Sequence, residues 1–319
     1  MNNQELLDNK INMKNIDAYY DLYDKATLYL VEKANLNYLQ AFLRVYNDIK
    51  DANTSNKGLS ENEVEKLSEY EDRISGLYIL NEEIRVALVL ILIKAFKHVD
   101  ASLDLISPDY IGYLFTFIIQ NLFEKEIKKE KMDHISILDI NLGSGNLINL
   151  IANNLSFDSS LTGIEIDEGY AYIASAFSDL QGNELVVYRN SCLDYMQLSA
   201  NVVIGDLDCV IQNGKYLPYE AILKYQNTNV DKSFMIFLVD NDFFNQKDIE
   251  DFKKRFKGTI IGLIALDKGL FKKKEKSILI ISPKKYKQVD TLATMLPSTK
   301  DEIKYKEALV DIKNWLKRF

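Results

Sequence analysis

The sequence predicts an α/β protein, in which an all-α N-terminal domain precedes a doubly wound, mostly parallel sheet with an antiparallel last strand. Only two of the 13 glycines and none of the four prolines occur before Pro108. Because both residue types are disfavoured inside helices, the first hundred residues should be helical. From residue 135 onward, short apolar runs alternate with helical stretches, as in βαβ units. We therefore expect a helical domain over residues 1–100 and an α/β domain over residues 101–319.

The N-terminal hundred residues carry three helix signals. Ser60 followed by Glu63 forms a capping box that should open a helix. Residues 80–97 are apolar nearly all round, which predicts a buried helix packed against the next domain. Residues 51–58 are polar and should form a linker. One helical stripe is predicted from the apolar spacing of Tyr19, Leu22, Tyr23, Ala26 and Leu30.

The strands of the second domain are predicted from short apolar runs. The runs are mostly continuous rather than alternating, which is typical of parallel strands covered on both faces. Two later runs, 259–266 and 277–281, are joined by a lysine-rich loop too short for a helical crossover, so they should pair antiparallel. The first five predicted strands are 135–140, 161–166, 185–188, 202–204 and 234–239.

Composition narrows the class of protein. The 319 residues are 47% apolar and 27% charged, which excludes a mostly disordered or fibrous chain. Cys192 and Cys209 are too few for a disulfide framework or a four-cysteine zinc site, and they favour a reducing, cytoplasmic location. No signal peptide is visible, and the longest strongly apolar run, 86–93, is far shorter than the ~20 residues of a membrane span. His98 and His134 have no ligand spacing, so no metal site is predicted.

The most informative stretch is a glycine loop after the first predicted strand, residues 137–148, with the sequence ILDINLGSGNLI. Gly143 and Gly145 let the backbone approach a ligand closely. Asp139 ends the strand, and its carboxylate disfavours a phosphate but favours a cationic amino group. Ile148 stands where a dinucleotide fingerprint has its third glycine. These features favour S-adenosylmethionine, whose amino acid end carries an ammonium, over the nicotinamide cofactor of an oxidoreductase.

Two further carboxylates follow the next strands. Glu165 lies 20 residues beyond Gly145, about the distance at which an acidic residue reaches the ribose of a bound adenosine. Asp194, after the third strand, could accept a hydrogen bond from an exocyclic amine, and Tyr195 could line the adenine pocket. Taken singly, Asp139 and Glu165 could instead be helix N-caps and Asp194 a turn residue. Three matches in order, each at a strand end, favour an adenosyl site.

With these residues in this order, the chain resembles a class I methyltransferase. The upstream segment Ser107-Pro108-Asp109-Tyr110-Ile111-Gly112 resembles the Thr-Pro-x-x-Ile element of gamma-order adenine-N6 DNA methyltransferases. That element also occurs in modification subunits of type I restriction systems. The chain is most similar to small, stand-alone adenine-methyltransferase-like proteins of Gram-positive bacteria. The resemblance implies a Rossmann-like methyltransferase sheet and adenine-N6 methylation of DNA.

The resemblance also implies roles for individual residues. Ser107 and Asp109 would lie beside the methionine end of S-adenosylmethionine. Asp139 and the loop with Gly143 and Gly145 would hold the amino acid moiety. Glu165 would bind the ribose and Asp194 the adenine amine.

The catalytic motif that follows strand four departs from the family pattern. The family has Asn, Asp or Ser, then two prolines and an aromatic residue that stacks on the flipped base. Here the segment is Asp206-Leu207-Asp208-Cys209. Asp206 keeps the hydrogen-bond acceptor and is the predicted catalytic residue, while Tyr216 and Tyr219 could supply stacking from another loop. Slow methyl transfer is expected, and a catalytically inactive cofactor-binding or regulatory module is the alternative.

Charge is distributed unevenly. Residues 251–319 hold 18 basic and 8 acidic side chains, a net charge of +10, whereas the other 250 residues carry −18. The lysines between residues 253 and 287 are therefore predicted to contact DNA, or alternatively to form a solvated face. After Pro283 only 36 residues remain, without an element suited to the major groove. Target recognition would then need a protein partner or the N-terminal domain. The lysines singled out for DNA contact are Lys272, Lys273, Lys274 and Lys276.

Overall fold

The computed structural model describes residues 11–129, 131–194, 196–207, 211–227, 230–271, 274–286 and 289–319. Contacts divide the chain into two compact units. The first contains the residues up to Asp109 together with Gly143–Asn154 and Tyr172–Glu184. The second contains Tyr110–Leu142, Leu155–Ala171 and Leu185–Phe319.

Four helices build most of the first unit, and α2 contacts the other three. The predicted apolar stripe on α2 is confirmed, since all five of its residues are buried. The predicted capping box is also confirmed, because the Ser60 N–H donates to Glu63 Oε2 at 2.9 Å. The helices are α2 (Met13–Ala34), α3 (Tyr38–Asp51), α4 (Glu61–Ser75) and α5 (Asn81–His98).

Helix α5 was predicted to be apolar and buried nearly all round, and the structure differs from this prediction. Leu90 is 46% exposed, whereas Glu82 and Arg85 are buried. The same helix contacts α7 (Asn146–Asn154), the helix that follows the glycine loop. Charged side chains are buried here because they pair with one another, as described below.

A buried acidic pair lies between α3 and α4. Asp48 and Glu71 are each 5% exposed. Thr54 donates a hydrogen bond to Glu71, and Arg44 Nε lies 3.7 Å from Asp48 Oδ2. Burial raises the pKa of Glu71 to about 8; the charge of Asp48 adds to the shift and the Thr54 hydrogen bond opposes it.

Glu71→Gln is therefore expected to stabilise the protein increasingly as pH rises from 4.5 to 8. Between the usual glutamate pKa of 4.5 and the folded-state pKa of about 8, the folded chain holds a proton that the unfolded chain has lost. The free energy of unfolding then falls as pH rises through this window, and Gln removes that dependence. We expect a gain of about 2 kcal/mol at pH 8 and little change at pH 4.5, measured by urea unfolding. Parallel pH profiles for the two proteins would contradict this.

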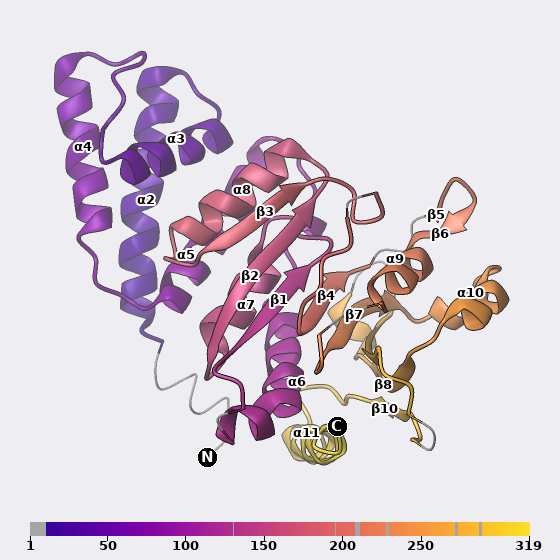
Figure 1. The fold of residues 1–319 in the computed structure, drawn as a ribbon. Helices are drawn as coiled ribbons and strands as arrows, with labels where there is room; N and C mark the ends of the chain where they lie inside the picture. The colour runs from indigo at the N-terminus through magenta and orange to yellow at the C-terminus, as the bar shows by residue number, and fades with distance from the viewer. Residues whose placement is uncertain are drawn as a thin grey trace. The chain divides into compact units, whose positions relative to one another are not determined.

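The second unit is built around an eight-stranded sheet with the order β10-β8-β9-β7-β4-β1-β2-β3 (Figure 1). Strand β9 runs antiparallel to β8, as predicted, and also to β7, and all other neighbours are parallel. The strands are β1 (His134–Asp139), β2 (Asp158–Glu165), β3 (Leu185–Arg189), β4 (Val202–Asp206), β7 (Phe234–Asp240), β8 (Thr259–Ala265), β9 (Lys276–Ser282) and β10 (Leu292–Met295).

Strand β10 was not predicted. It has only four residues, and its side chains alternate between partly buried and exposed positions. Its pairing with β8 is therefore the main reason for its extended conformation. A separate two-stranded hairpin, β5 (Ile211–Gln212) and β6 (Lys215–Tyr216), precedes α9 (Leu217–Tyr225).

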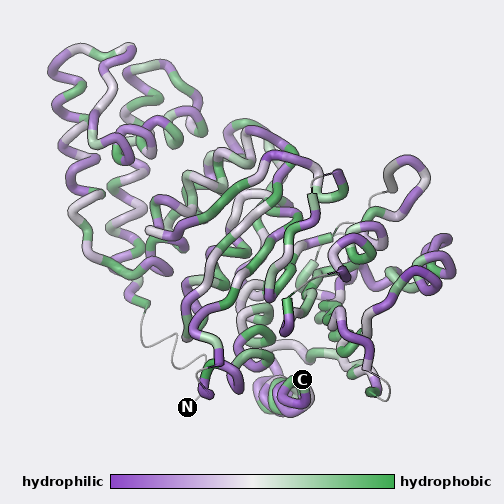
Figure 2. Tube along the Cα trace, in the orientation of Figure 1, coloured by the Kyte–Doolittle hydropathy of each residue, from purple (hydrophilic) through white to green (hydrophobic). Residues whose placement is uncertain are grey.

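The core of this unit lies along the central strands. All seven residues of β7, which lies between β4 and β9 in the sheet, are buried. The hydrophobic colouring of the central strands in Figure 2 follows this burial. One apolar cluster joins β1, β4, β7 and β9 to α9 and α10 (Ile249–Arg255). Two further helices contact the sheet: Phe123 of α6 (Asp109–Lys128) lies 5.7 Å from Phe234, and Trp315 of α11 (Glu302–Leu316) donates to Ile261 O.

Candidate functional site

Four adjacent strands of the sheet each end in a carboxylate. Strands β2, β1, β4 and β7 are consecutive and parallel, so their carboxyl ends lie along one edge. Open α/β sheets bind their ligands at this edge. Three of the carboxylates are predicted site residues that the fold brings together, and the fourth was not anticipated. The residues are Glu165, Asp139, Asp206 and Asp240.

Asp139 is buried, at 1% exposure. Its Oδ1 accepts the N–H of Asn141 at 3.0 Å. Burial raises the pKa of Asp139 to about 7; the charges of Glu165 and Asp206 add to the shift, and the Asn141 hydrogen bond opposes it. A carboxylate in this setting would gain from a bound cation, which fits an ammonium-bearing ligand.

Glu165 is 7% exposed, and its Oε1 accepts the N–H of Asp167 at 3.0 Å. The helix that follows, α8 (Glu168–Asp179), has Asp167 as its cap, because Asp167 Oδ1 accepts the Tyr170 N–H at 3.0 Å. The alternative in which Glu165 is the N-cap is therefore wrong. Asp139 is no N-cap either, since α7 begins seven residues later, at Asn146.

Asp206 and Asp240 are both paired with lysines that lie after β8. Lys276 Nζ lies 2.6 Å from Asp206 Oδ1, and the two side chains are 13% and 21% exposed. Lys274 Nζ lies 2.9 Å from Asp240 Oδ2, whose side chain is 4% exposed. Asn141 Nδ2 also donates to the backbone O of Asp206 at 2.6 Å. The lysines thus neutralise the two carboxylates on the β4–β7 side of the row.

Several of the lysines that were predicted to contact DNA form ion pairs within the protein. Lys274 and Lys276 have carboxylate partners, as do Lys253 with Glu250 at 2.8 Å and Lys268 with Glu275 at 2.8 Å. Lys272 and Lys273 lie outside the described residues. A polyanion that binds Lys274 or Lys276 would therefore have to compete with a carboxylate of the protein.

The glycine loop belongs to the first unit, and its glycines are required by that unit's own packing. Gly143 has a φ of +55°, and a Cβ there would lie 3.0 Å from the carbonyl O of Leu105. Gly145 has a φ of +78°, and its Cβ would lie 3.2 Å from the Cβ of Ala174. Both the left-handed conformation and the close neighbours disfavour larger residues. The predicted close approach to a ligand stays a prediction.

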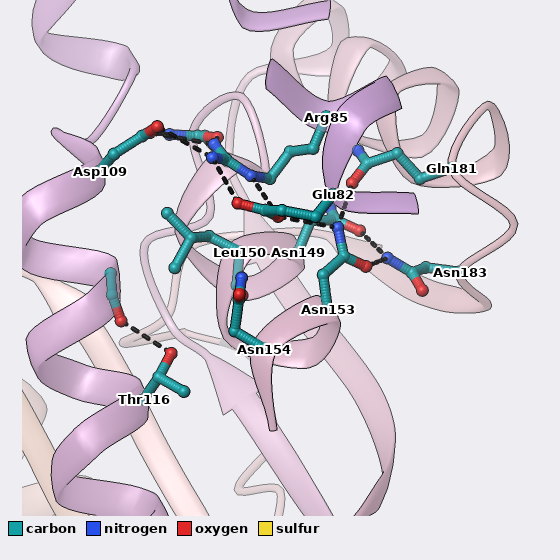
Figure 3. Close-up of polar contacts among 12 residues, drawn as sticks. Glu82, Arg85, Asp109, Thr116, Asn149, Leu150, Asn153, Asn154, Gln181 and Asn183 are labelled. Atoms are coloured by element: carbon teal, nitrogen blue, oxygen red, sulfur yellow. Dashed lines mark hydrogen bonds and ion pairs between the residues drawn. The ribbon is translucent and has the colours of Figure 1, made fainter. Parts of the chain in front are cut away.

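The predicted Ser107–Asp109 element is held by a buried arginine that the sequence analysis did not single out (Figure 3). Arg85 is fully buried and forms two-point contacts with the carboxylates of Glu82 and Asp109, all at 2.8–2.9 Å. Arg85 Nη1 also donates to Asn146 Oδ1 at 2.7 Å, and Asn146 Nδ2 donates to Ser107 O at 2.8 Å. Asp109 therefore fixes the element through Arg85. A charged residue three positions after Glu82, in an otherwise apolar predicted helix, was the sequence signal for Arg85.

Asp194 is exposed and lies in a turn after β3, where its N–H donates to Ser191 O at 3.2 Å. Lys224 Nζ anchors this turn by donating to the carbonyl groups of Cys192 and Leu193, at 2.8 and 2.9 Å. Burial raises the pKa of Cys192 to about 11, so this thiol is protonated at neutral pH. Tyr195 lies outside the described residues, as do Asp208 and Cys209.

Tyr216 and Tyr219 do not present their rings to a ligand. Each is 2% exposed. They pack in an aromatic cluster in which Tyr219 lies 4.8 Å from Phe243 and 4.6 Å from Phe252, between ring centroids. The expectation that they could stack on a base is wrong, because apolar packing between α9 and α10 buries them. The ring of Phe271, which sequence reasoning passed over, instead lies near Asp206: its centroid is 5.7 Å from Lys276 Nζ.

Within the described part of the chain, no group of three or more His, Cys, Asp or Glu side chains could hold a metal ion. No helix in those ranges is both long enough and apolar enough to span a membrane.

The fold is that of the class I S-adenosylmethionine-dependent methyltransferases. A Listeria monocytogenes protein provisionally assigned to that class has a TM-score of 0.80 at 23% identity, and the match covers 96% of this chain and all of that one. A type I restriction-modification methyltransferase subunit from Streptococcus thermophilus has a TM-score of 0.61 at 13% identity, covering 92% of this chain and 74% of the subunit.

Sequence comparison adds a relative without a described activity. The chain is 28% identical over 196 residues to the uncharacterized protein YtxK of Bacillus subtilis. The match spans 60% of this chain and only 57% of YtxK. No protein-family model matches the chain.

Proposed function

We propose that this protein is an S-adenosylmethionine-dependent methyltransferase that acts on an exocyclic amine, with N6 of adenine in DNA as the target. The observation that carries the proposal is the row of carboxylates at the ends of β2, β1 and β4 in a methyltransferase fold. Glu165 and Asp139 would bind the cofactor, and Asp206 would accept a hydrogen bond from the target amine. The solved type I modification subunit supports DNA as the substrate class and a protein partner in target recognition.

The cofactor roles follow the residue assignments made from the sequence. Asp139 would pair with the ammonium of S-adenosylmethionine, beside the loop of Gly143 and Gly145. Glu165 would accept hydrogen bonds from the ribose, and Asp194 with Tyr195 would bind the adenine. Ser107 and Asp109 would lie beside the methionine end of the cofactor, with Asp109 held in place by Arg85. The cofactor supplies the methyl group by direct displacement, so the work of these residues is positioning and exclusion of water.

Glu165→Ala is expected to weaken S-adenosylmethionine binding by about 1–3 kcal/mol, because it leaves the ribose hydroxyls without an acceptor. Isothermal titration calorimetry measures the change. Glu168→Ala is the matched control, since Glu168 lies three residues further on and pairs with Arg189 at an exposed position. Equal affinities for wild type and Glu165→Ala would remove Glu165 from the site.

The affinity for S-adenosylmethionine is also expected to depend on pH through Asp139. The folded-state pKa of this carboxyl is about 7, so it is largely protonated at pH 6. A bound ammonium favours the ionised form, hence the affinity should rise with pH, by about fivefold between pH 6 and 7 and about tenfold between pH 6 and 8, and level off above pH 8. Calorimetry over this range, with Asp139→Asn as control, measures the effect. A flat profile for the wild type would show that the ammonium does not contact Asp139.

A non-catalytic cofactor-binding module is the second candidate function. It is favoured by Lys276, which holds the acceptor Asp206 in an ion pair, and by the motif's missing prolines and aromatic residue. The deciding experiment is tritiated methyl transfer from S-adenosylmethionine to unmethylated DNA, RNA and protein. Transfer to DNA supports the enzyme, whereas measurable cofactor affinity without transfer to any of the three supports the module.

A further inference from the structure

The ammonium of Lys276 lies between a carboxylate and an aromatic ring. Its Nζ is 2.6 Å from Asp206 Oδ1 and 5.7 Å from the centroid of the Phe271 ring. Only 13% of the lysine side chain is exposed. Asp206 and Lys276 lie 70 residues apart in the sequence and two strands apart in the sheet. The contact is therefore a product of the fold and not of local sequence.

A nucleobase that carries an exocyclic amine could bind to a site made of a carboxylate and an aromatic ring. The carboxylate accepts a hydrogen bond from the amine, and the ring stacks on the base. In this structure the lysine ammonium satisfies the carboxylate and lies over the ring, at the distance of a cation–π contact.

We propose that Lys276 occupies the place of the target amine, that Phe271 supplies the stacking ring, and that a nucleic acid displaces the lysine. This inference rests on the proposed function and adds a specificity-determining pair to it. When the strand binds, Lys276 would leave Asp206 for a phosphate. The base would then stack on Phe271 and its amine would donate to Asp206.

The charges explain why a nucleic acid would be selected. Moving Lys276 away from Asp206 leaves a partly buried ammonium without its counter-ion, which is unfavourable unless a new anion replaces the carboxylate. A phosphate of the substrate does so, whereas a neutral nucleoside carries no such group. The net charge of +10 over residues 251–319 also attracts a polyanion and repels a cationic peptide.

The exchange is tested by a double-mutant cycle on oligonucleotide binding. Fluorescence anisotropy at low salt would compare wild type, Asp206→Asn, Lys276→Met and the double variant, with a short adenine-containing single strand. Asp206→Asn should tighten binding about three- to tenfold because it releases Lys276, and it should have no effect in the Lys276→Met background. Asp301→Asn is the matched control, since Asp301 pairs with Lys304 at 2.8 Å and an asparagine can still cap α11.

A second comparison tests Phe271. In the Asp206→Asn background, Phe271→Leu should weaken binding of the adenine-containing strand at least fivefold, and should change binding of a strand with an abasic target position less than twofold. Equal losses on both strands would remove the ring from the proposal.

The exchange would be overturned if the protein bound no oligonucleotide, or if Asp206→Asn left the oligonucleotide affinity unchanged. It would also be overturned if Asp206→Asn changed that affinity equally in the wild-type and Lys276→Met backgrounds. A fourth contrary result would be a lysine-rich peptide that binds the wild type and binds Asp206→Asn more weakly. The result with the peptide would indicate that Asp206 binds cationic amines and not a nucleobase. S-adenosylmethionine calorimetry on the same proteins separates this inference from the proposed function. If the wild type binds S-adenosylmethionine but the double-mutant cycle shows no coupling between Asp206 and Lys276, only the exchange is rejected. If the wild type does not bind S-adenosylmethionine, the proposed function is rejected.

Discussion

Replacing Arg85 by methionine is expected to lower the free energy of unfolding by about 3–5 kcal/mol, as for other buried ion pairs that lose one partner. The guanidinium is fully buried, and all five of its N–H groups donate, to Glu82, Asp109 and Asn146. Without it, the carboxylate of Glu82, which is 5% exposed, stays in the interior without its countercharge. Urea unfolding at pH 7 measures the loss.

Arg73→Met is the matched control, because Arg73 lies exposed in the last turn of α4. It should change stability by less than about 0.5 kcal/mol. The pair Arg85→Met with Glu82→Leu should recover part of the loss, since an apolar pair removes the unpaired charge. A loss below about 1 kcal/mol for Arg85→Met alone would show that the carboxylates find other partners.

Asp206→Ala is expected to lower the rate of methyl transfer by about 10²-fold or more, and to leave the affinity for S-adenosylmethionine within about twofold of wild type. The variant removes the acceptor that would hold the target amine, while Asp139 and Glu165, the proposed cofactor residues at the ends of β1 and β2, are untouched. The wild-type rate should itself be low on bulk DNA, because the motif lacks its prolines and ring. Single-turnover tritium transfer measures the rates, and calorimetry measures the affinity.

Two variants accompany this experiment. Asp206→Asn keeps a side-chain acceptor and should lose less activity than Asp206→Ala. Asp242→Ala removes an exposed carboxylate two residues beyond β7 and should retain the wild-type rate. An Asp206→Ala protein that folds, binds the cofactor and transfers methyl groups at the wild-type rate would exclude Asp206 from catalysis.

The fold was predictable to the extent that each element carries its own signal. The parallel strands were found because burial on both faces demands continuous apolar runs, which are visible in the chain. The antiparallel pairing of β8 and β9 followed from the short connection between them. Strand β10 was missed because its four residues have no apolar run, and only β8 beside it gives them a partner.

The candidate site was predictable in part for a related reason. Asp139, Glu165 and Asp206 each end a strand, and parallel neighbours bring their ends to one edge, so sequence order alone placed them together. Tyr216 and Tyr219 showed the limit of this reasoning. Their proximity in sequence to the motif indicated a stacking role, but packing against Phe243 and Phe252 buries both rings.

The sequence by itself determined the alternation of strands and helices, the glycine loop, and the carboxylates at the ends of three central strands. Only the tertiary structure decided which charges meet: Arg85 with Asp109 across 24 residues, and Lys276 with Asp206 across 70. The physical reason is the sequence distance over which each effect acts. Strand and turn preferences act over a few neighbouring residues, whereas an ion pair forms only between side chains that the packed fold brings to within about 4 Å.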